Sequence, residues 1–144
     1  MADDDSQYRD ELVARVERGE RPKFLHFWGH TEKRPGTFDA ACLSQWYDAP
    51  FVVDELRFAT AEHFMMYGKA KLFGDDEIAA RILADARPAV AKKLGRAVQH
   101  FDEALWVAHR FALISRGNIA KFGQHAPLCD FLMRTGDKVL VEAS

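Results

Sequence analysis

An acidic and a basic side chain lie on one face of a predicted helix. Glu62, Met66 and Lys69 are spaced at i, i+4 and i+7, which lines them up over about 10 Å at a rise of ~1.5 Å per residue. An acid at one end of such a groove and a cation at the other suit a charged ligand. A carboxylate in the first turn of a helix can also simply complement the helix dipole, so position alone leaves both interpretations of Glu62 open.

Four basic residues are candidates for contacts with an anionic ligand: Arg34, Lys69, Arg96 and Lys121. Taken singly, such side chains are usually solvated. Gly95 directly precedes Arg96, and the absence of a Cβ atom lets a backbone approach a ligand closely. We therefore expect the Gly95-Arg96 pair to be the strongest of these candidates.

Three tryptophans are candidates either for the core or for stacking on a planar ligand: Trp28, Trp46 and Trp106. A core position is the commoner use of tryptophan. Trp46, in a Ser44-Gln45-Trp46 loop, is the least typical of a core. Glu142 ends a Val-Leu-Val run, and the alternation there does not decide whether it faces solvent or a cleft.

Several large enzyme classes lack their motifs here. The six histidines form no HExxH pattern, and there is no GxSxG elbow, P-loop or GxGxxG fingerprint. Cys42 and Cys129 stand far apart and outside any zinc-binding spacing, so we expect reduced, buried thiols. The sequence gives no reason to expect a metal or another cofactor.

The composition is that of one globular domain. The chain has 144 residues, of which 48% are hydrophobic and 29% charged, a length and balance typical of a single hydrophobic core. The formal net charge of −2 gives no overall basic field for nucleic acid. The polar N-terminus and the lack of a long apolar window predict a cytoplasmic protein.

The first third of the sequence predicts a peripheral helix and short strands. Residues 3–20 form a weakly amphipathic helix that Gly19 and Pro22 would end. Residues 24–28 are typical of a buried strand. Residues 52–53 and 56–58 flank Asp54-Glu55 as a tight hairpin, although Glu55 is not the glycine that such a turn prefers.

The remainder is mostly helical. Predicted boundaries are a helix capped by Thr60 and ending at Gly74, a second opened by Asp75 or Asp76, a third from Pro88, a long one capped by Asp102 and interrupted by Gly117, a last one over 128–134, and a strand over 138–142. The sum is a mainly α (α+β) fold, a single compact helical domain with a small β element. We expect residues 1–22 to be a peripheral N-terminal helix and residues 23–144 to be the domain.

Seven short segments follow one another along the chain. Each segment alone is weak evidence for a protein family, but their order is specific. They are Leu43-Ser44-Gln45-Trp46, Ala59-Thr60-Ala61-Glu62-His63-Phe64-Met65-Met66, Lys69-Ala70-Lys71, Ala91-Lys92-Lys93-Leu94-Gly95-Arg96, Trp106 with Arg110, Asn118-Ile119-Ala120-Lys121-Phe122, and Thr135-Gly136-Asp137-Lys138-Val139-Leu140-Val141-Glu142-Ala143-Ser144. From Phe24 to Ser144 this order resembles the NADAR, or YbiA-like, domain family.

The resemblance implies a YbiA-like fold and an N-glycosidase that acts on ligands related to NAD and ADP-ribose. Two activities are associated with the family: hydrolysis of ribosylamino-pyrimidine phosphates of riboflavin synthesis, and removal of ADP-ribose from a modified base, notably guanine. Both break a ribose C1′–N bond. The expected partner is a small nucleotide substrate, with ADP-ribosylated nucleic acid as a further candidate; oligomeric state is left open.

The resemblance also implies roles for particular residues. Glu62 is similar to the active-site glutamate of the family, and Glu142 to a second acidic group. Lys69, Arg96 and Lys121 match phosphate or ribose contacts, and Trp46 and Trp106 match aromatic positions near the pocket. We place Arg34, Ser44, Gln45 and Gly95 with them as substrate-binding residues.

Three positions depart from the family pattern: Gln45 and His125 replace asparagine, and Glu55 replaces glycine. We expect Gln45 to affect recognition of the base. Relatives also continue into an Asp-Arg-x-Trp-Gly-x-Gly stretch, whose absence here would remove part of the site. A non-catalytic module that binds NAD or ADP-ribose is the alternative.

Overall fold

The computed structural model describes residues 4–143; Met1, Ala2, Asp3 and Ser144, which fall within the predicted segments 3–20, 1–22 and 23–144, lie outside the described residues. In chain order the elements are α1 (Asp4–Glu17), β1 (Phe24–Phe27), the 3-10 helix η1 (Ala40–Leu43), β2 (Phe51–Val53), β3 (Leu56–Phe58), α2 (Ala61–Leu72), α3 (Asp76–Ala84), α4 (Pro88–Arg96), α5 (Glu103–Gln124), α6 (Ala126–Arg134) and β4 (Val139–Glu142). The predicted mainly α fold with a small β element is confirmed.

Side-chain caps set the helix starts where the sequence predicted them. The Thr60 hydroxyl accepts from the backbone N–H of His63 and begins α2, and Asp75 and Asp102 cap α3 and α5 in the same way. Gly74 has a φ of 73°, a left-handed value suited to glycine after a helix end. These boundaries follow from contacts within three or four residues.

Two helix boundaries differ from the prediction. α5 continues through Gly117 to Gln124, and α6 begins at Ala126 rather than at residue 128. A Cβ atom on Gly117 would lie 2.7 Å from Cδ1 of Phe64. Gly117 therefore lets α5 approach α2 closely, and the prediction that it interrupts the helix is wrong.

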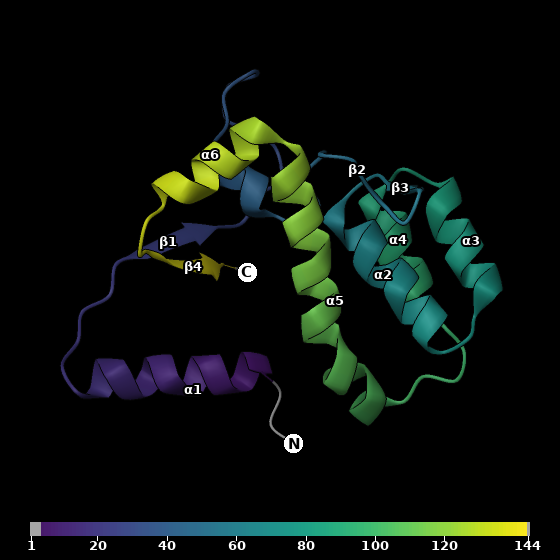
Figure 1. The fold of residues 1–144 in the computed structure, drawn as a ribbon, viewed down its shortest axis with the longest axis horizontal. Coiled ribbons are helices and arrows are strands. Elements are labelled where there is room, and N and C mark those ends of the chain that lie inside the picture. Colours follow the sequence, from purple (N-terminus) through teal and green to yellow (C-terminus); the bar gives the residue numbers. More distant parts are fainter. Residues whose placement is uncertain (1–3, 144) are drawn as a thin grey trace.

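The strands form two small sheets. β2 and β3 pair as the predicted antiparallel hairpin, with Phe51 opposite Phe58. Its turn residues Asp54 and Glu55 have φ values of 50° and 67°, as a primed turn requires. β1 and β4 pair in parallel, with Phe27 opposite Glu142, so strands far apart in the sequence lie side by side (Figure 1).

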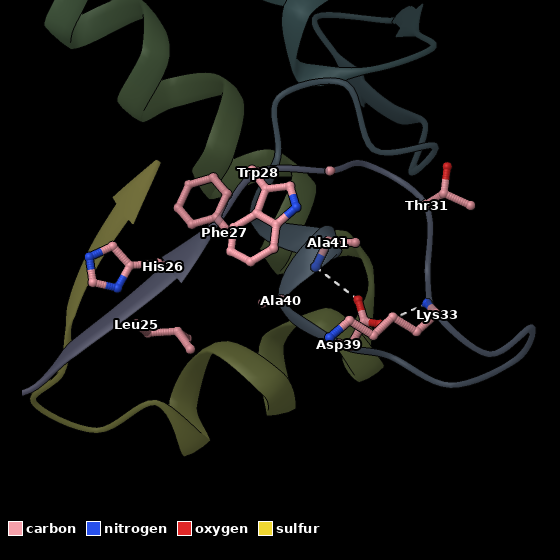
Figure 2. Close-up of a pocket in the computed structure, with 10 residues that line it drawn as sticks. Leu25, His26, Phe27, Trp28, Thr31, Lys33, Asp39, Ala40 and Ala41 are labelled. Atoms are coloured by element: carbon pink, nitrogen blue, oxygen red, sulfur yellow. Dashed lines mark hydrogen bonds between the residues drawn. The ribbon is translucent and has the colours of Figure 1, made fainter. Parts of the chain in front are cut away.

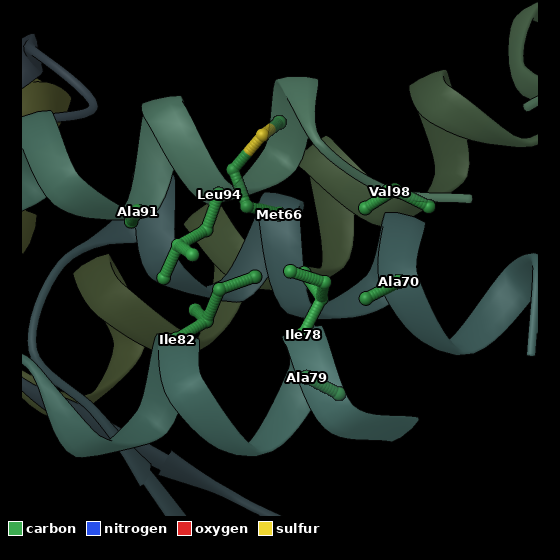
Figure 3. Close-up of a cluster of buried hydrophobic side chains, with 8 residues drawn as sticks. All are labelled: Met66, Ala70, Ile78, Ala79, Ile82, Ala91, Leu94 and Val98. Carbon is green, nitrogen blue, oxygen red and sulfur yellow. The ribbon is translucent and has the colours of Figure 1, made fainter. Parts of the chain in front are cut away.

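α2 is the central helix of the larger group of elements. It packs against α3, α4 and α5, while β1, β4, α1 and α6 lie on the other side of α5 (Figure 1). Buried apolar side chains of α2, α3 and α4 interdigitate, as Figure 3 shows: Met66, Ala70, Ile78, Ala79, Ile82, Ala91, Leu94 and Val98. This packing fixes the position of α4 alongside α2.

Gly95 is a second point of close helix approach. A Cβ atom there would lie 1.9 Å from Sδ of Met66, so α4 packs on α2 at a distance that only glycine permits. The tight contact of Gly95 is thus with a neighbouring helix, and the prediction of a close approach to a ligand at this glycine is not what the structure shows.

The exposure of several side chains differs from what the sequence predicted. Trp28 is 72% exposed rather than part of the core, because it follows the end of β1 and no element covers it closely. Cys42 is buried and Cys129 half-buried, and among the described residues both are free thiols. Within residues 4–143 no helix is both long and apolar enough to cross a membrane.

Candidate functional site

Glu62 is a buried carboxylate at the start of α2. Its side chain lies in the first helical turn, after the Thr60 cap, and the residue is only 6% exposed. Its backbone N–H donates to the carbonyl oxygen of Gln45 over 3.0 Å. The acid is therefore held between a helix and the loop that carries Gln45 and Trp46.

The surroundings of Glu62 favour its protonated form. Burial raises the pKa of this carboxyl above its ordinary value of 4.5, and the nearby charge of Glu142 raises it further. Lys92 and Arg96 act in the opposite direction and lower the pKa. The two predicted acids thus lie close enough to interact, with cations beside them, as is common for carboxyl groups at functional sites.

The cations beside Glu62 come from one face of α4. Lys92 and Arg96 are spaced at i, i+4 and are exposed. Nζ of Lys92 lies 5.8 Å from the ring centroid of Trp46, within the range of a cation–π contact. Arg96 was predicted as a site residue and Lys92 was not, although the spacing of the two on one helix face was a signal that could have identified Lys92.

Lys69 and Arg96 form a second group of positive charge. Burial lowers the pKa of Lys69, and the charge of Arg96 lowers it further. Nζ of Lys69 lies 4.7 Å from the ring centroid of Phe101 and 5.6 Å from that of half-buried Trp106. Two neighbouring cations beside aromatic faces are suited to binding an anionic ligand.

A buried lysine, Lys121, is hydrogen-bonded to the backbone of the loop at Ser44. Nζ of Lys121 donates to the carbonyl oxygens of Cys42 and Ser44 over 2.7 and 2.8 Å. The Ser44 hydroxyl accepts from the backbone N–H of Trp46 over 3.2 Å. These bonds shape the turn that presents Gln45 and Trp46, both half-buried, toward the site.

Lys121 differs from the expected solvated cation. It is 0% exposed, and burial lowers its pKa to about 8. Its ammonium group is engaged by the two backbone carbonyls, so the structure gives it a role in positioning the loop. The exposed Arg34 lies in another loop, and no contact joins its side chain to Glu62 in the described part of the chain.

A groove adjoins the two acids. It has a volume of about 680 Å³ and lies between α5, β4, α6 and the Ser44 loop. Its polar lining residues are Gln45, Asn118 and Glu142, and its apolar ones are Phe27, Leu43, Phe111, Ile114, Ile119, Phe122, Leu132 and Leu140. Glu62 is not among them, but it is joined to the groove by its hydrogen bond to Gln45 and its interaction with Glu142.

A smaller pocket of about 400 Å³ lies along β1 and the loop before η1. Figure 2 shows Trp28, Lys33 and Asp39 among its lining residues. The Asp39 carboxylate accepts from the backbone N–H groups of Lys33 and Ala41, which lowers its pKa. This carboxylate orders the loop, and the pocket contains none of the predicted site residues.

The described residues contain no cluster of three or more His, Cys, Asp or Glu side chains that could hold a metal ion. Among the predicted residues the structure brings together Glu62, Glu142 and Arg96, with Lys69, Trp46 and Trp106 at the edges of this group. Asn118 and Phe101 join them without having been predicted as site residues.

Comparisons with known proteins agree on one family. The NADAR domain profile matches residues 26–144. The chain is 33% identical over 130 residues to N-glycosidase R617 of Acanthamoeba polyphaga mimivirus, covering 87% of this chain and 75% of that protein. It is 29% identical over 103 residues to N-glycosidase Npun_R5314 of Nostoc punctiforme, covering 72% and 66%.

A solved structure is similar as well. The NMR structure of the Escherichia coli protein YbiA superposes with a TM-score of 0.71 at 25% identity, over 87% of this chain and 69% of that one. The YbiA-like fold predicted from the ordered segments is confirmed. On the profile match and these likenesses, the chain belongs to the NADAR domain family.

Proposed function

We propose that this protein is an N-glycosidase that hydrolyses the bond between a ribose C1′ and a nitrogen. The family and the two relatives named N-glycosidase support a glycosidase-type enzyme. The observation that carries the proposal is the buried Glu62, whose pKa is raised by burial and by Glu142 and opposed by Lys92 and Arg96. A carboxyl group tuned in this way is suited to proton transfer at a glycosidic bond.

The reaction follows from the charges that develop. As the C1′–N bond breaks, its electron pair leaves with the base, and the ribose becomes an oxocarbenium-like cation that a fixed carboxylate stabilises. The departing nitrogen takes up the proton of the Glu62 carboxyl group, whose raised pKa favours the protonated form, and the resulting carboxylate faces the cation. Water then forms the new bond to C1′ and gives a proton to Glu62, while Glu142 orients the water or the substrate.

The cations supply the binding energy that positions C1′. Lys69 and Arg96 would hold a phosphate, and Trp106 or Trp46 would stack on a planar ring. One acid–base residue contributes about 10²–10⁴ in rate, so much of the remaining acceleration has to come from this positioning. The proposed substrates are an ADP-ribosylated guanine base, free or in nucleic acid, and a ribosylamino-pyrimidine phosphate.

Incubation with ADP-ribosylated guanosine and with the ribosylamino-pyrimidine phosphate tests the proposal. The expected result is cleavage of the C1′–N bond, with release of the base-containing product from the sugar phosphate. Glu62→Gln should lower turnover by at least about a hundredfold while ligand affinity persists. Glu77→Gln is the matched control, since Glu77 is an exposed first-turn acid of α3.

The same experiment decides the alternative function. The cation and aromatic group around Lys69 favours binding of a phosphorylated ligand whether or not chemistry follows. Both ligands recovered intact, with measurable affinity, would mean a non-catalytic binding module. Turnover near wild type in the Glu62→Gln variant would remove this residue from the mechanism.

A further inference from the structure

Helix α5 is apolar on two sides, and only one of them is packed against the body of the protein. Leu113 and Gly117 face α2. On the groove side, Phe111 and Ile119 are exposed, and Ile119 is 73% accessible to solvent. Leu140, on β4 across the groove, is exposed too. An apolar surface of this kind next to a candidate active site is typical of a surface that takes part in binding.

The groove has one polar end, and that end adjoins Glu62. Leu140 and Glu142 alternate with Val139 and Val141 along β4, so both project into the groove. Gln45 lies at the same end, and its carbonyl oxygen accepts from the amide of Glu62. A ligand in the groove would therefore place its polar edge beside the two acids and its flat faces against apolar side chains.

Asn118 lines the groove together with Gln45 and Glu142. Its Nδ2 donates to the carbonyl oxygen of Ile114 over 2.9 Å, which fixes the amide and leaves Oδ1 without a hydrogen-bond partner in the described part of the chain. The Glu142 carboxylate is likewise an acceptor. Two acceptors in one groove are suited to a planar ring whose edge carries N–H donors.

We propose that this groove binds the departing base of the substrate, and that Asn118 reads an N–H-bearing edge of an amino-substituted heterocycle. This inference rests on the proposed N-glycosidase function. Its volume of about 680 Å³ lies within the range of small-molecule sites. The Lys69 and Arg96 group then holds the phosphate side, and C1′ lies between the two subsites, next to Glu62.

Two nucleotides that differ by one amino group provide the probe. Guanosine monophosphate carries an exocyclic amine that inosine monophosphate lacks. Each nucleotide is tested as an inhibitor of the hydrolysis of whichever substrate the protein cleaves. The direct affinity of each nucleotide is measured by calorimetry. We expect the guanine nucleotide to bind about tenfold more tightly, and Asn118→Leu to reduce this preference to about twofold or less.

A matched pair of exposed apolar residues tests the apolar wall. Ile119 and Met133 are each 73% exposed, but only Ile119 lines the groove. Ile119→Ser should raise KM several-fold and leave kcat and thermal stability near wild type. Met133→Ser should leave KM, kcat and stability unchanged.

The outcomes separate the inference from the function on which it rests. An unchanged KM for hydrolysis in both Asn118→Leu and Ile119→Ser would overturn the base subsite. Equal affinity for the two nucleotides would overturn it too. Neither result would contradict the proposed glycosidase activity. If the wild type hydrolyses neither substrate, the direct affinities still test the groove. A change of oligomeric state in Ile119→Ser at unchanged KM would show that a second copy covers this face, and the inference would fail.

Discussion

The backbone amide of Glu62 donates to the carbonyl oxygen of Gln45 with an N···O distance of 3.0 Å. This bond connects the first turn of α2 to the Ser44 loop, whose backbone carbonyls accept from Lys121. The acid, the loop and the groove therefore share one rigid attachment. A substitution in any one of them should therefore alter the position of the other two.

Glu62→Gln should raise the thermal stability at pH 7.5 while it removes activity. The raised folded-state pKa means that this group stabilises the fold below its ordinary value of 4.5, and that the contribution is lost as pH rises through the folded value. A neutral amide avoids the cost of burying the charge. Melting temperatures of the wild type and of Glu62→Gln are measured from pH 4 to 8. The variant should become increasingly more stable than the wild type as the pH rises. A variant less stable than the wild type at pH 7.5 would contradict this.

Gly95→Ala and Gly117→Ala should each destabilise the protein by about 1–3 kcal/mol, because the added methyl group overpacks the contacts with Met66 and Phe64. Gly123→Ala is the control, since Gly123 lies in the same helix as Gly117 with nothing within 4 Å of the added atom. It should be neutral or gain up to about 1 kcal/mol. Urea denaturation measures all three, and equal losses would refute the close-approach explanation.

Lys121→Met should lower the free energy of unfolding by about 1–3 kcal/mol, since the carbonyls of Cys42 and Ser44 lose their donor. Loss of the buried charge offsets part of this cost. The folded-state pKa of about 8 lies below the ordinary 10.5, so the lysine stabilises the fold most above pH 10.5, and this contribution is lost as pH falls through 8.

The exposed Lys93 on α4 supplies the control for this substitution. Lys93→Met should leave stability and KM unchanged, whereas Lys121→Met should also raise KM through displacement of the Ser44 loop. Denaturation curves and kinetics of the two variants, measured together at pH 7, provide the comparison. Unchanged stability and KM in Lys121→Met would exclude the positioning role.

His63 should make the fold sensitive to acid. Its Nε2–H donates to the carbonyl oxygen of Asp85 over 2.6 Å, and Nδ1 pairs with the Thr60 hydroxyl. Burial lowers the pKa of this imidazole below 6.5. Its contribution to stability is therefore present above pH 6.5 and is lost as pH falls through the lowered folded value.

Melting temperatures of wild type and His63→Gln between pH 5 and 7.5 measure this effect. The wild type should lose stability faster as the pH falls, whereas the variant, which carries no titrating group there, should show a flatter dependence. Parallel curves would show that other groups control the acid sensitivity.

Much of the local structure was predictable because its causes lie within a few residues. Thr60, Asp75 and Asp102 cap helices through hydrogen bonds three residues ahead, and Pro88 fits the first turn of α4. The hairpin at Asp54 likewise follows from alternation and chain reversal. The ordered segments identified the family for the same reason, since order and residue type are properties of the chain itself.

The exposure of a side chain depends on parts of the chain that are distant in sequence. Nothing near Lys121 in the sequence indicated that η1 would bury it, nothing near Trp28 that it would stay exposed, and nothing near Gly117 that Phe64 would lie against it. The parallel pairing of β1 with β4, which places Glu142 near Glu62, joins segments that are far apart in the sequence. Hydrogen-bond and steric rules act locally and determined the elements, whereas burial and charge proximity are set by packing, which only the tertiary structure decided.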